Sequence, residues 1–276
     1  MNVLRSPARA LLATAVTVAA LGATTLPARA QGLVVYDNFA TGLAPSRWIG
    51  TEARQFGAIP AEVSRGVVSG QLRLQDKIFG DNASDVGTST GRNGVQFARN
   101  GLNITTMRAT VTMRSIGAGT CPANPTPGAN RARLFGFFFN AGTPQPFNNY
   151  NDVYAGIQLQ RLSNSSDAAG VLHVIGFVGI CTDDSCINTT TLSTLDLGLA
   201  AVGTPVALQV GWNKASHLFS FQKDLEAAQT IPYTYDDAQA PAFPGKRIEV
   251  YNVAPHCTAS RVPVNTTADF DGVMTN

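Results

Sequence analysis

Short stretches of alternating apolar and polar residues recur along this chain. The clearest is 153–162, where every second residue from Val153 to Leu159 is apolar and polar residues such as Gln158 lie between them. A period of two predicts a strand with one face in a core. The other predicted strands are 33–36, 67–75, 107–116, 134–140, 171–181, 205–212, 218–223, 246–253 and 268–275.

Turn-forming residues separate these runs, as in Asn213-Lys214-Ala215-Ser216, and almost nothing has the period of a helix. Roughly ten to fourteen antiparallel strands without helical crossovers predict an all-β fold, a two-sheet antiparallel β-sandwich or jelly roll.

The first thirty residues have the pattern of a cleaved secretion signal. Arg5 and Arg9 precede an uncharged, Ala-rich run over 10–26, and Ala28-Arg29-Ala30 is typical of a cleavage site. A membrane anchor is the alternative, but the run barely reaches spanning length. We therefore expect a secreted or periplasmic protein of bacterial style, with residues 31–276 forming a single β-sandwich domain.

Charge excludes one class of partner. Three of the twenty Lys and Arg residues belong to the leader, which leaves seventeen basic against eighteen acidic residues. No basic cluster is present, so we expect no nucleic-acid partner, and no second apolar stretch predicts a membrane span. Oligomeric state is not encoded in any pattern that we recognise.

Four cysteines, an even number in an exported chain, predict two disulfides, for which three pairings exist. Cys181 and Cys186 flank a turn-rich tip, so this pair would clamp a hairpin, and Cys121 would then pair with Cys257. A zinc site is the alternative, but these spacings fit no zinc motif.

The two ends of the mature chain carry matching motifs. Asp37-Asn38-Phe39 leads to Trp48, Gly70-Gln71-Leu72 begins a strand, and Asp271-Gly272-Val273 lies near the C-terminus. Together these segments resemble the first and last strands of concanavalin A-like sandwiches, most closely the laminarinase-like glycoside hydrolases. The resemblance implies a concanavalin A-like fold. Because many proteins in this family hold a structural calcium, it also implies a calcium ligated by Asp37 and Asp271; no other cofactor is expected.

Catalytic residues of the family are missing. Such hydrolases carry Glu-x-Asp-x-x-Glu on a central strand, because retaining hydrolysis needs two carboxylates about 5–5.5 Å apart. The corresponding strand here offers one carboxylate, Asp152, and the four glutamates are scattered. The His-containing motif of alginate lyases is also absent, and His173 is interpreted as a partly buried strand residue. The protein is therefore expected to be non-catalytic.

The best candidate for ligand binding is the segment 145–154, rich in Asn and aromatic residues, with the polar face of the strand after it. Rings stack on the apolar faces of sugars, and amides and carboxylates bond sugar hydroxyls. The hypothesis is lectin-like recognition of a polysaccharide or glycan. The predicted ligand-binding residues are Phe147, Tyr150, Asp152, Tyr154, Gln158 and Gln160.

Other aromatic residues are weaker candidates. Trp48 and Trp212 are expected in the core, while Tyr233 and Tyr235 are alternative stacking platforms. Two other functions stay open: a structural matrix protein of the cell exterior without a small ligand, and a polysaccharide-degrading enzyme, hydrolase or lyase, with an unrecognised site.

Overall fold

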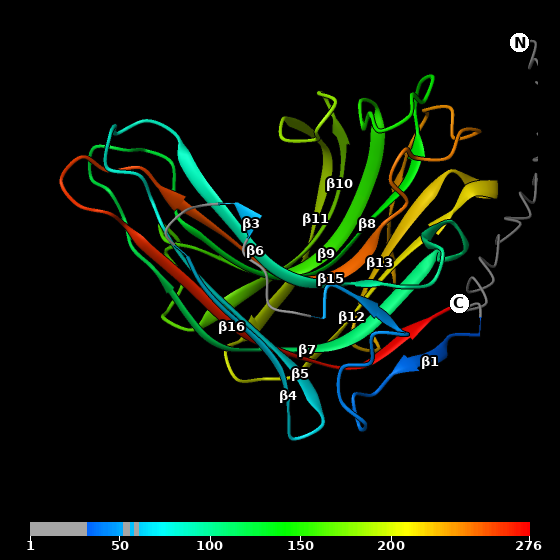
Figure 1. Ribbon diagram of the computed structural model, residues 1–276, viewed down its shortest axis with the longest axis horizontal. Coiled ribbons are helices and arrows are strands. Elements are labelled where there is room, and N and C mark those ends of the chain that lie inside the picture. Colours follow the sequence, from blue (N-terminus) through cyan, green and yellow to red (C-terminus); the bar gives the residue numbers. More distant parts are fainter. Residues whose placement is uncertain (1–31, 52–55, 58–60) are drawn as a thin grey trace, which may run out of the picture. The chain divides into compact units, whose positions relative to one another are not determined.

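A computed structural model describes residues 32–51, 56–57 and 61–276, and Gly32–Asn276 form one compact unit. The predicted secretion signal, 1–30, lies outside the described residues and stays a prediction. In the described part the chain forms sixteen strands and two short 3₁₀ helices, η1 (Gly101–Asn103) and η2 (Lys214–Ser216). Two antiparallel sheets contain all of these strands (Figure 1).

The first sheet has the strand order β14-β13-β12-β7-β16-β5-β4, and β1 pairs with β16 beside this path. Its strands are β1 (Val34–Asp37), β4 (Ala61–Val68), β5 (Gln71–Phe79), β7 (Thr106–Ala118), β12 (Val206–Asn213), β13 (Leu218–Lys223), β14 (Gln229–Pro232) and β16 (Pro263–Thr275). The first and last strands of the unit are thus neighbours, with Val34 opposite Thr275.

The second sheet has the order β11-β10-β9-β8-β15-β6-β2, and β3 pairs with β6. Its strands are β2 (Trp48–Ile49), β3 (Phe56–Gly57), β6 (Thr88–Phe97), β8 (Ala129–Asn140), β9 (Asp152–Leu162), β10 (Val171–Cys181), β11 (Thr189–Ala201) and β15 (Lys246–Pro255). Figure 1 shows that this sheet is curved, with its concave side facing away from the first sheet and with β15 and β9 at the bottom of the curve.

Alternation within each strand builds the core between the sheets. On β9, the apolar residues Val153, Ala155, Ile157 and Leu159 are fully buried in this core. They pack with side chains of the first sheet such as Leu208. Because both sheets place one apolar face inward, the two-sheet antiparallel sandwich predicted from the sequence is confirmed.

Some strand boundaries differ from the prediction. The segment 67–75 is not one strand but the hairpin β4–β5, which turns at Ser69 and Gly70. Both turn residues have positive φ, 52° and 76°, as two-residue hairpins of type I′ require. The strands β6 and β11 were not predicted. Their first halves consist mainly of Thr, Ser, Gly and other polar residues, and apolar residues alternate only later, at Val95 and Phe97 and at Leu195, Leu197 and Leu199.

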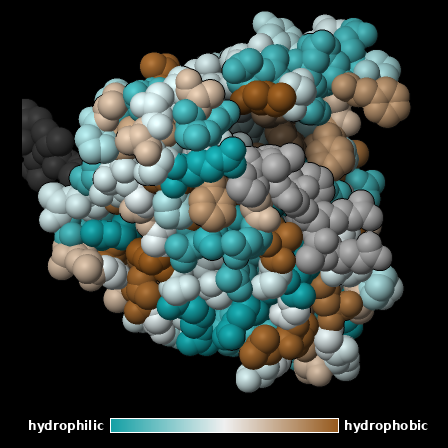
Figure 2. Space-filling model, turned by 60° about the vertical axis from the view of Figure 1, so that its left-hand side comes forward, coloured by the Kyte–Doolittle hydropathy of each residue, from teal (hydrophilic) through white to brown (hydrophobic). Residues whose placement is uncertain are grey.

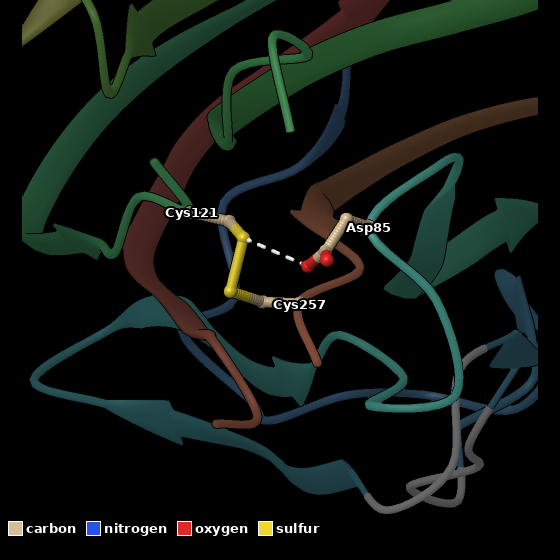
Figure 3. Close-up of side chains that lie close together, drawn as sticks. All are labelled: Asp85, Cys121 and Cys257. Carbon is tan, nitrogen blue, oxygen red and sulfur yellow. Dashed lines mark hydrogen bonds between the residues drawn. A yellow bond between two sulfur atoms is a disulfide. The ribbon is translucent and has the colours of Figure 1, made fainter. Parts of the chain in front are cut away.

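Both predicted disulfides are present. Cys121 bonds to Cys257 across 136 residues, and Cys181 bonds to Cys186 at a hairpin tip. Asp85 lies against the first disulfide, with Oδ1 3.5 Å from Cys121 Sγ (Figure 3). The three residues do not form a metal site, because disulfide sulfurs are not thiolate ligands and the Asp85 carboxylate accepts hydrogen bonds from Thr258 N and Oγ1.

Across residues 32–51, 56–57 and 61–276, no helix is long and apolar enough to cross a membrane.

Candidate functional site

A groove of about 1210 Å³ lies on the outer face of the second sheet. Figure 2 shows one side of the molecule, which is hollowed towards the upper right, where hydrophobic and hydrophilic side chains lie next to each other. The strands contribute Thr88, Thr90, Gly91, Arg92, Arg131, Arg133, Phe135, Phe137, Tyr154, Gln158, Gln160, Ile175, Phe177, Thr191, Thr194, Arg247 and Tyr251. Loop residues Asn149, Ser185, Cys186, Ile187, Asn188 and Phe243 border it.

Strand alternation places these side chains. On β8, Ala132 and Leu134 point into the core, so Arg131, Arg133 and Phe135 point into the groove. The predicted face assignment of β9 is confirmed in the same way: its apolar residues are in the core, while Gln158 and Gln160 line the groove.

A buried ion pair lies at the floor of the groove. Glu249 on β15 is 1% exposed; its Oε1 accepts a hydrogen bond from Arg133 Nε at 2.6 Å, and its Oε2 lies 2.8 Å from Arg247 Nε. Burial alone would raise the pKa of Glu249, but the charges of Arg247, Arg133 and Arg92 outweigh it and hold the pKa well below its usual range. The carboxylate is therefore a fixed negative charge surrounded by positive ones.

The arginines of the groove are held against aromatic rings. The guanidinium carbon of Arg133 lies 4.2 Å from the centroid of the Tyr251 ring and 4.8 Å from that of Phe135. Arg247 lies 4.4 Å from Phe135, and Arg131 lies 5.5 Å from Tyr251. Such cation–π contacts restrict the side chains to a few orientations.

A short hydrogen-bonded series continues the groove onto β9. Gln160 Oε1 accepts from Arg131 Nε at 2.9 Å and from Gln158 Nε2 at 2.7 Å. Next to Gln160 in the sheet stands His173, whose Nδ1 and Nε2 lie 2.7 Å and 2.9 Å from carboxylate oxygens of Asp196 and Asp167. These two partners raise the pKa of His173.

Aromatic rings form another part of the groove lining. Phe135, Phe137 and Tyr154 pack in one cluster with ring centroids 5.2–6.0 Å apart, and Phe177 lies beside them. Gly156 makes room for this cluster, because a Cβ there would lie 2.6 Å from the Phe177 ring. A larger residue at 156 would displace that ring.

The structure corrects the expected exposure of Tyr154. It is on the groove side, as predicted, but only 7% exposed, because its ring packs against Phe135, Phe137 and Phe177. It is a wall of the groove and not an open stacking face.

We therefore expect Tyr154→Ala to lower the free energy of unfolding by about 2 kcal/mol, contrary to the small change that an exposed ring would give. This is less than the roughly 3–5 kcal/mol of a core aromatic residue, because neighbours can relax into the open groove. Chemical denaturation measures it; a loss under about 0.5 kcal/mol would mean that the ring is not packed as described.

The remaining predicted binding residues lie outside the groove lining. Phe147 is fully exposed, and Tyr150 is half-exposed beside a second, smaller cavity formed with 182–188. Asp152 is fully buried: its Oδ1 accepts from Asn140 Nδ2 at 2.8 Å and from Ala242 N at 3.0 Å. The loop itself reaches the rim, where Asn149 N donates to Asp184 O. A binding role for these three residues stays a prediction.

Asp152, the carboxylate of the strand on which the family carries its catalytic motif, and Glu249, at the floor of the groove, are poorly suited to proton transfer. A general acid needs a raised pKa and contact with substrate. Burial raises the pKa of Asp152, but its side chain is sealed from solvent; Glu249 has a lowered pKa and is ion-paired.

The residues expected to hold calcium are already engaged in protein contacts. Asp37 is buried; its Oδ1 lies 3.2 Å from Arg47 Nη1, and its Oδ2 accepts from Trp48 Nε1 at 2.7 Å. Asp271 accepts a hydrogen bond from Gly272 N. In this structure Arg47 and Trp48 occupy both oxygens of the Asp37 carboxylate, and calcium binding stays a prediction.

The other aromatic candidates belong mainly to the interior. Trp48 is buried, and Trp212 packs on the core with its Nε1 donating to Tyr233 Oη at 2.7 Å. Tyr233 is itself buried, which excludes it as a stacking platform, whereas Tyr235 is 39% exposed.

No family model and no curated protein sequence matches the chain. Among solved structures, a glycoside hydrolase family 16 endo-glucanase from Bacteroides ovatus aligns with a TM-score of 0.43 and 11% identity over 85% of this chain and 98% of that chain. Winged bean acidic lectin aligns at 0.33 and 12%, over 81% and 99%. The carbohydrate binding module CBM66 from Bacillus subtilis aligns at 0.32 and 12%, over 72% and 91%.

The two-sheet antiparallel sandwich expected from the resemblance is confirmed by the strand order of the two sheets. At such scores the likeness says nothing about what the groove binds.

Proposed function

We propose that the chain is an exported, non-catalytic protein that binds a polysaccharide in the groove of the second sheet. The observation that supports this most is the groove itself: an open channel of about 1210 Å³ with aromatic rings on one part and hydrogen-bonding side chains on the other.

The lining has the chemistry that a sugar chain requires. The Phe177 ring offers an apolar face for the C–H side of a sugar ring. Gln160 and the threonines of β6 and β11 offer hydrogen-bonding groups to hydroxyls. Gln158, which is 5% exposed, donates to Gln160 and supports it from below. A groove that mixes a few placed polar groups with aromatic surface is the usual form of a ligand site.

Two disulfides favour a location outside the cytoplasm, where such bonds persist. This agrees with the predicted leader, and export to a compartment that contains polysaccharides is part of the proposal.

Binding without degradation is the expected result when the mature protein is tested on a panel of soluble polysaccharides. Affinity electrophoresis detects binding, while reducing-sugar release and absorbance at 235 nm detect hydrolysis and lyase action. Retardation by at least one polysaccharide without product would support the proposal. Product formation would make the protein an enzyme, and no retardation by any polymer would favour a matrix protein instead.

A further inference from the structure

We propose that the groove selects an anionic polysaccharide, one that carries carboxylate or sulfate groups, and that Arg131 and Arg92 are among the residues that bind those groups. This inference rests on the proposed function and names its class of ligand.

The first argument is the local charge. Four arginines line the groove: Arg92, Arg131, Arg133 and Arg247. Three of them, Arg131, Arg133 and Arg247, outnumber the single carboxylate at the floor, Glu249, which pairs with the last two. The chain after its leader has seventeen basic and eighteen acidic residues, so this excess of positive charge is a property of the groove and not of the whole protein. In a concave site, such an excess raises the local concentration of anions.

The second argument is the way in which the guanidinium groups are presented. Arg131 and Arg133 use their Nε atoms for the bonds to Gln160 and Glu249, and Arg247 Nε faces Glu249. Within the described part of the chain, the Nη atoms of these three arginines have no hydrogen-bond partner and are not sealed from solvent. A planar guanidinium with its Nη donors accessible matches the oxygens of a carboxylate or sulfate group.

The third argument is the balance of donors and acceptors. A neutral sugar hydroxyl donates as well as accepts, so sites for neutral sugars need acceptors. Here Glu249 is buried beneath Arg133 and Arg247, and Gln160 Oε1 already accepts two hydrogen bonds. Threonine hydroxyls can still accept, but the charged side chains of the described lining are all arginines, which only donate and so favour a ligand rich in acceptor oxygens.

The fourth argument is the arrangement across the strands. Tyr251 is paired with Arg92 on one side and with Arg131 on the other, and Arg131 is paired with Gln160. The two arginines are thus two strands apart, on the order of 10 Å, with a tyrosine ring between them. A row of cation, ring and cation would hold two charged groups of one chain with a sugar ring between them.

The test compares three polymers with one backbone: dextran, carboxymethyl dextran and dextran sulfate. The mature protein should bind at least one anionic dextran, and the affinity should fall steeply between 50 mM and 500 mM NaCl, because salt screens these contacts. Uncharged dextran should bind at least tenfold more weakly. Comparing carboxymethyl dextran with dextran sulfate shows whether the groove recognises carboxylate or sulfate groups.

Arg131→Gln should weaken binding of the anionic polymer about tenfold or more, since it removes one charge-assisted contact. The matched control is Arg108→Gln on β7, which removes the same charge from the outer face of the first sheet and should leave affinity unchanged. Arg92→Gln repeats the test if Arg131→Gln proves unstable in a thermal melt.

Equal weakening by Arg108→Gln would overturn the inference, because binding would then depend on overall charge. Groove binding of a neutral polysaccharide, unchanged by Arg131→Gln and by Arg92→Gln, would also overturn it while leaving the proposed function intact. Failure to bind any polysaccharide, charged or neutral, would overturn both.

Discussion

Glu249→Gln should lower the free energy of unfolding by about 3–5 kcal/mol, the usual cost of removing one partner of a buried ion pair. The variant keeps the shape of the side chain but leaves Arg133 and Arg247, whose side chains are 11% and 15% exposed, without their counter-charge. The loss arises from these uncompensated cations, and urea denaturation at pH 7 measures it.

The matched control is Glu62→Gln. Glu62 pairs with Lys77 at 2.8 Å, but it is 64% exposed, so its loss should stay below about 1 kcal/mol. Similar losses for the two variants would contradict the description of Glu249 as a buried charge.

The pH dependence gives a second readout of the same group. The pKa of Glu249 is lower in the folded protein than its ordinary value near 4.3. The contribution of Glu249 to stability is therefore fully present above about pH 4.3 and is lost as the pH falls through the folded pKa. Below that range, wild type and Glu249→Gln should converge in stability.

Replacing both Cys121 and Cys257 by Ser should lower the free energy of unfolding by about 5 kcal/mol. This is more than we expect for removing the Cys181–Cys186 bond. The Cys121–Cys257 bond closes a loop of 136 residues, whereas Cys181–Cys186 closes one of five. The entropy of loop closure grows with the logarithm of loop length, which gives about 2 kcal/mol for the short loop.

Denaturation of the two double variants side by side measures this difference. The double variant of Cys181 and Cys186 is the matched control for that of Cys121 and Cys257, since each replaces two cysteines by serine. Equal losses, or a larger loss at the short loop, would show that strain or residual structure in the unfolded chain dominates over loop entropy.

Much of the second sheet was predictable from the alternation of apolar and polar residues, but the positive charge of its groove was not. The strand over 153–162 was found with the correct faces, because apolar residues at every second position specify which side is buried. The predicted strand over 134–140 began too late: β8 starts at Ala129, and the missed residues include Arg131 and Arg133, which alternate with Ala132 and Leu134.

Arg92 was missed because apolar alternation in β6 is confined to its last residues, Val95 and Phe97. The row of Arg92, Tyr251 and Arg131 joins three strands that are far apart in the sequence, so only the sheet order brings it together. A local signal was nevertheless present: Arg131-Ala132-Arg133-Leu134-Phe135 puts two arginines and a phenylalanine on one face of a strand. The loop with Phe147 and Tyr150 was predicted to bind a ligand because of its composition, yet the structure places these two side chains outside the groove lining.

The most direct test of the groove as the binding surface is the affinity of Phe177→Ala for the polysaccharide that the wild-type protein binds, measured by affinity electrophoresis or titration calorimetry. Phe177 lines the groove, while Tyr235, also partly exposed, does not; Tyr235→Ala is therefore the matched control. We expect at least a tenfold loss of affinity for Phe177→Ala, about 1.4 kcal/mol, and no change for Tyr235→Ala. Unchanged affinity in Phe177→Ala, with the fold intact, would contradict binding in the groove.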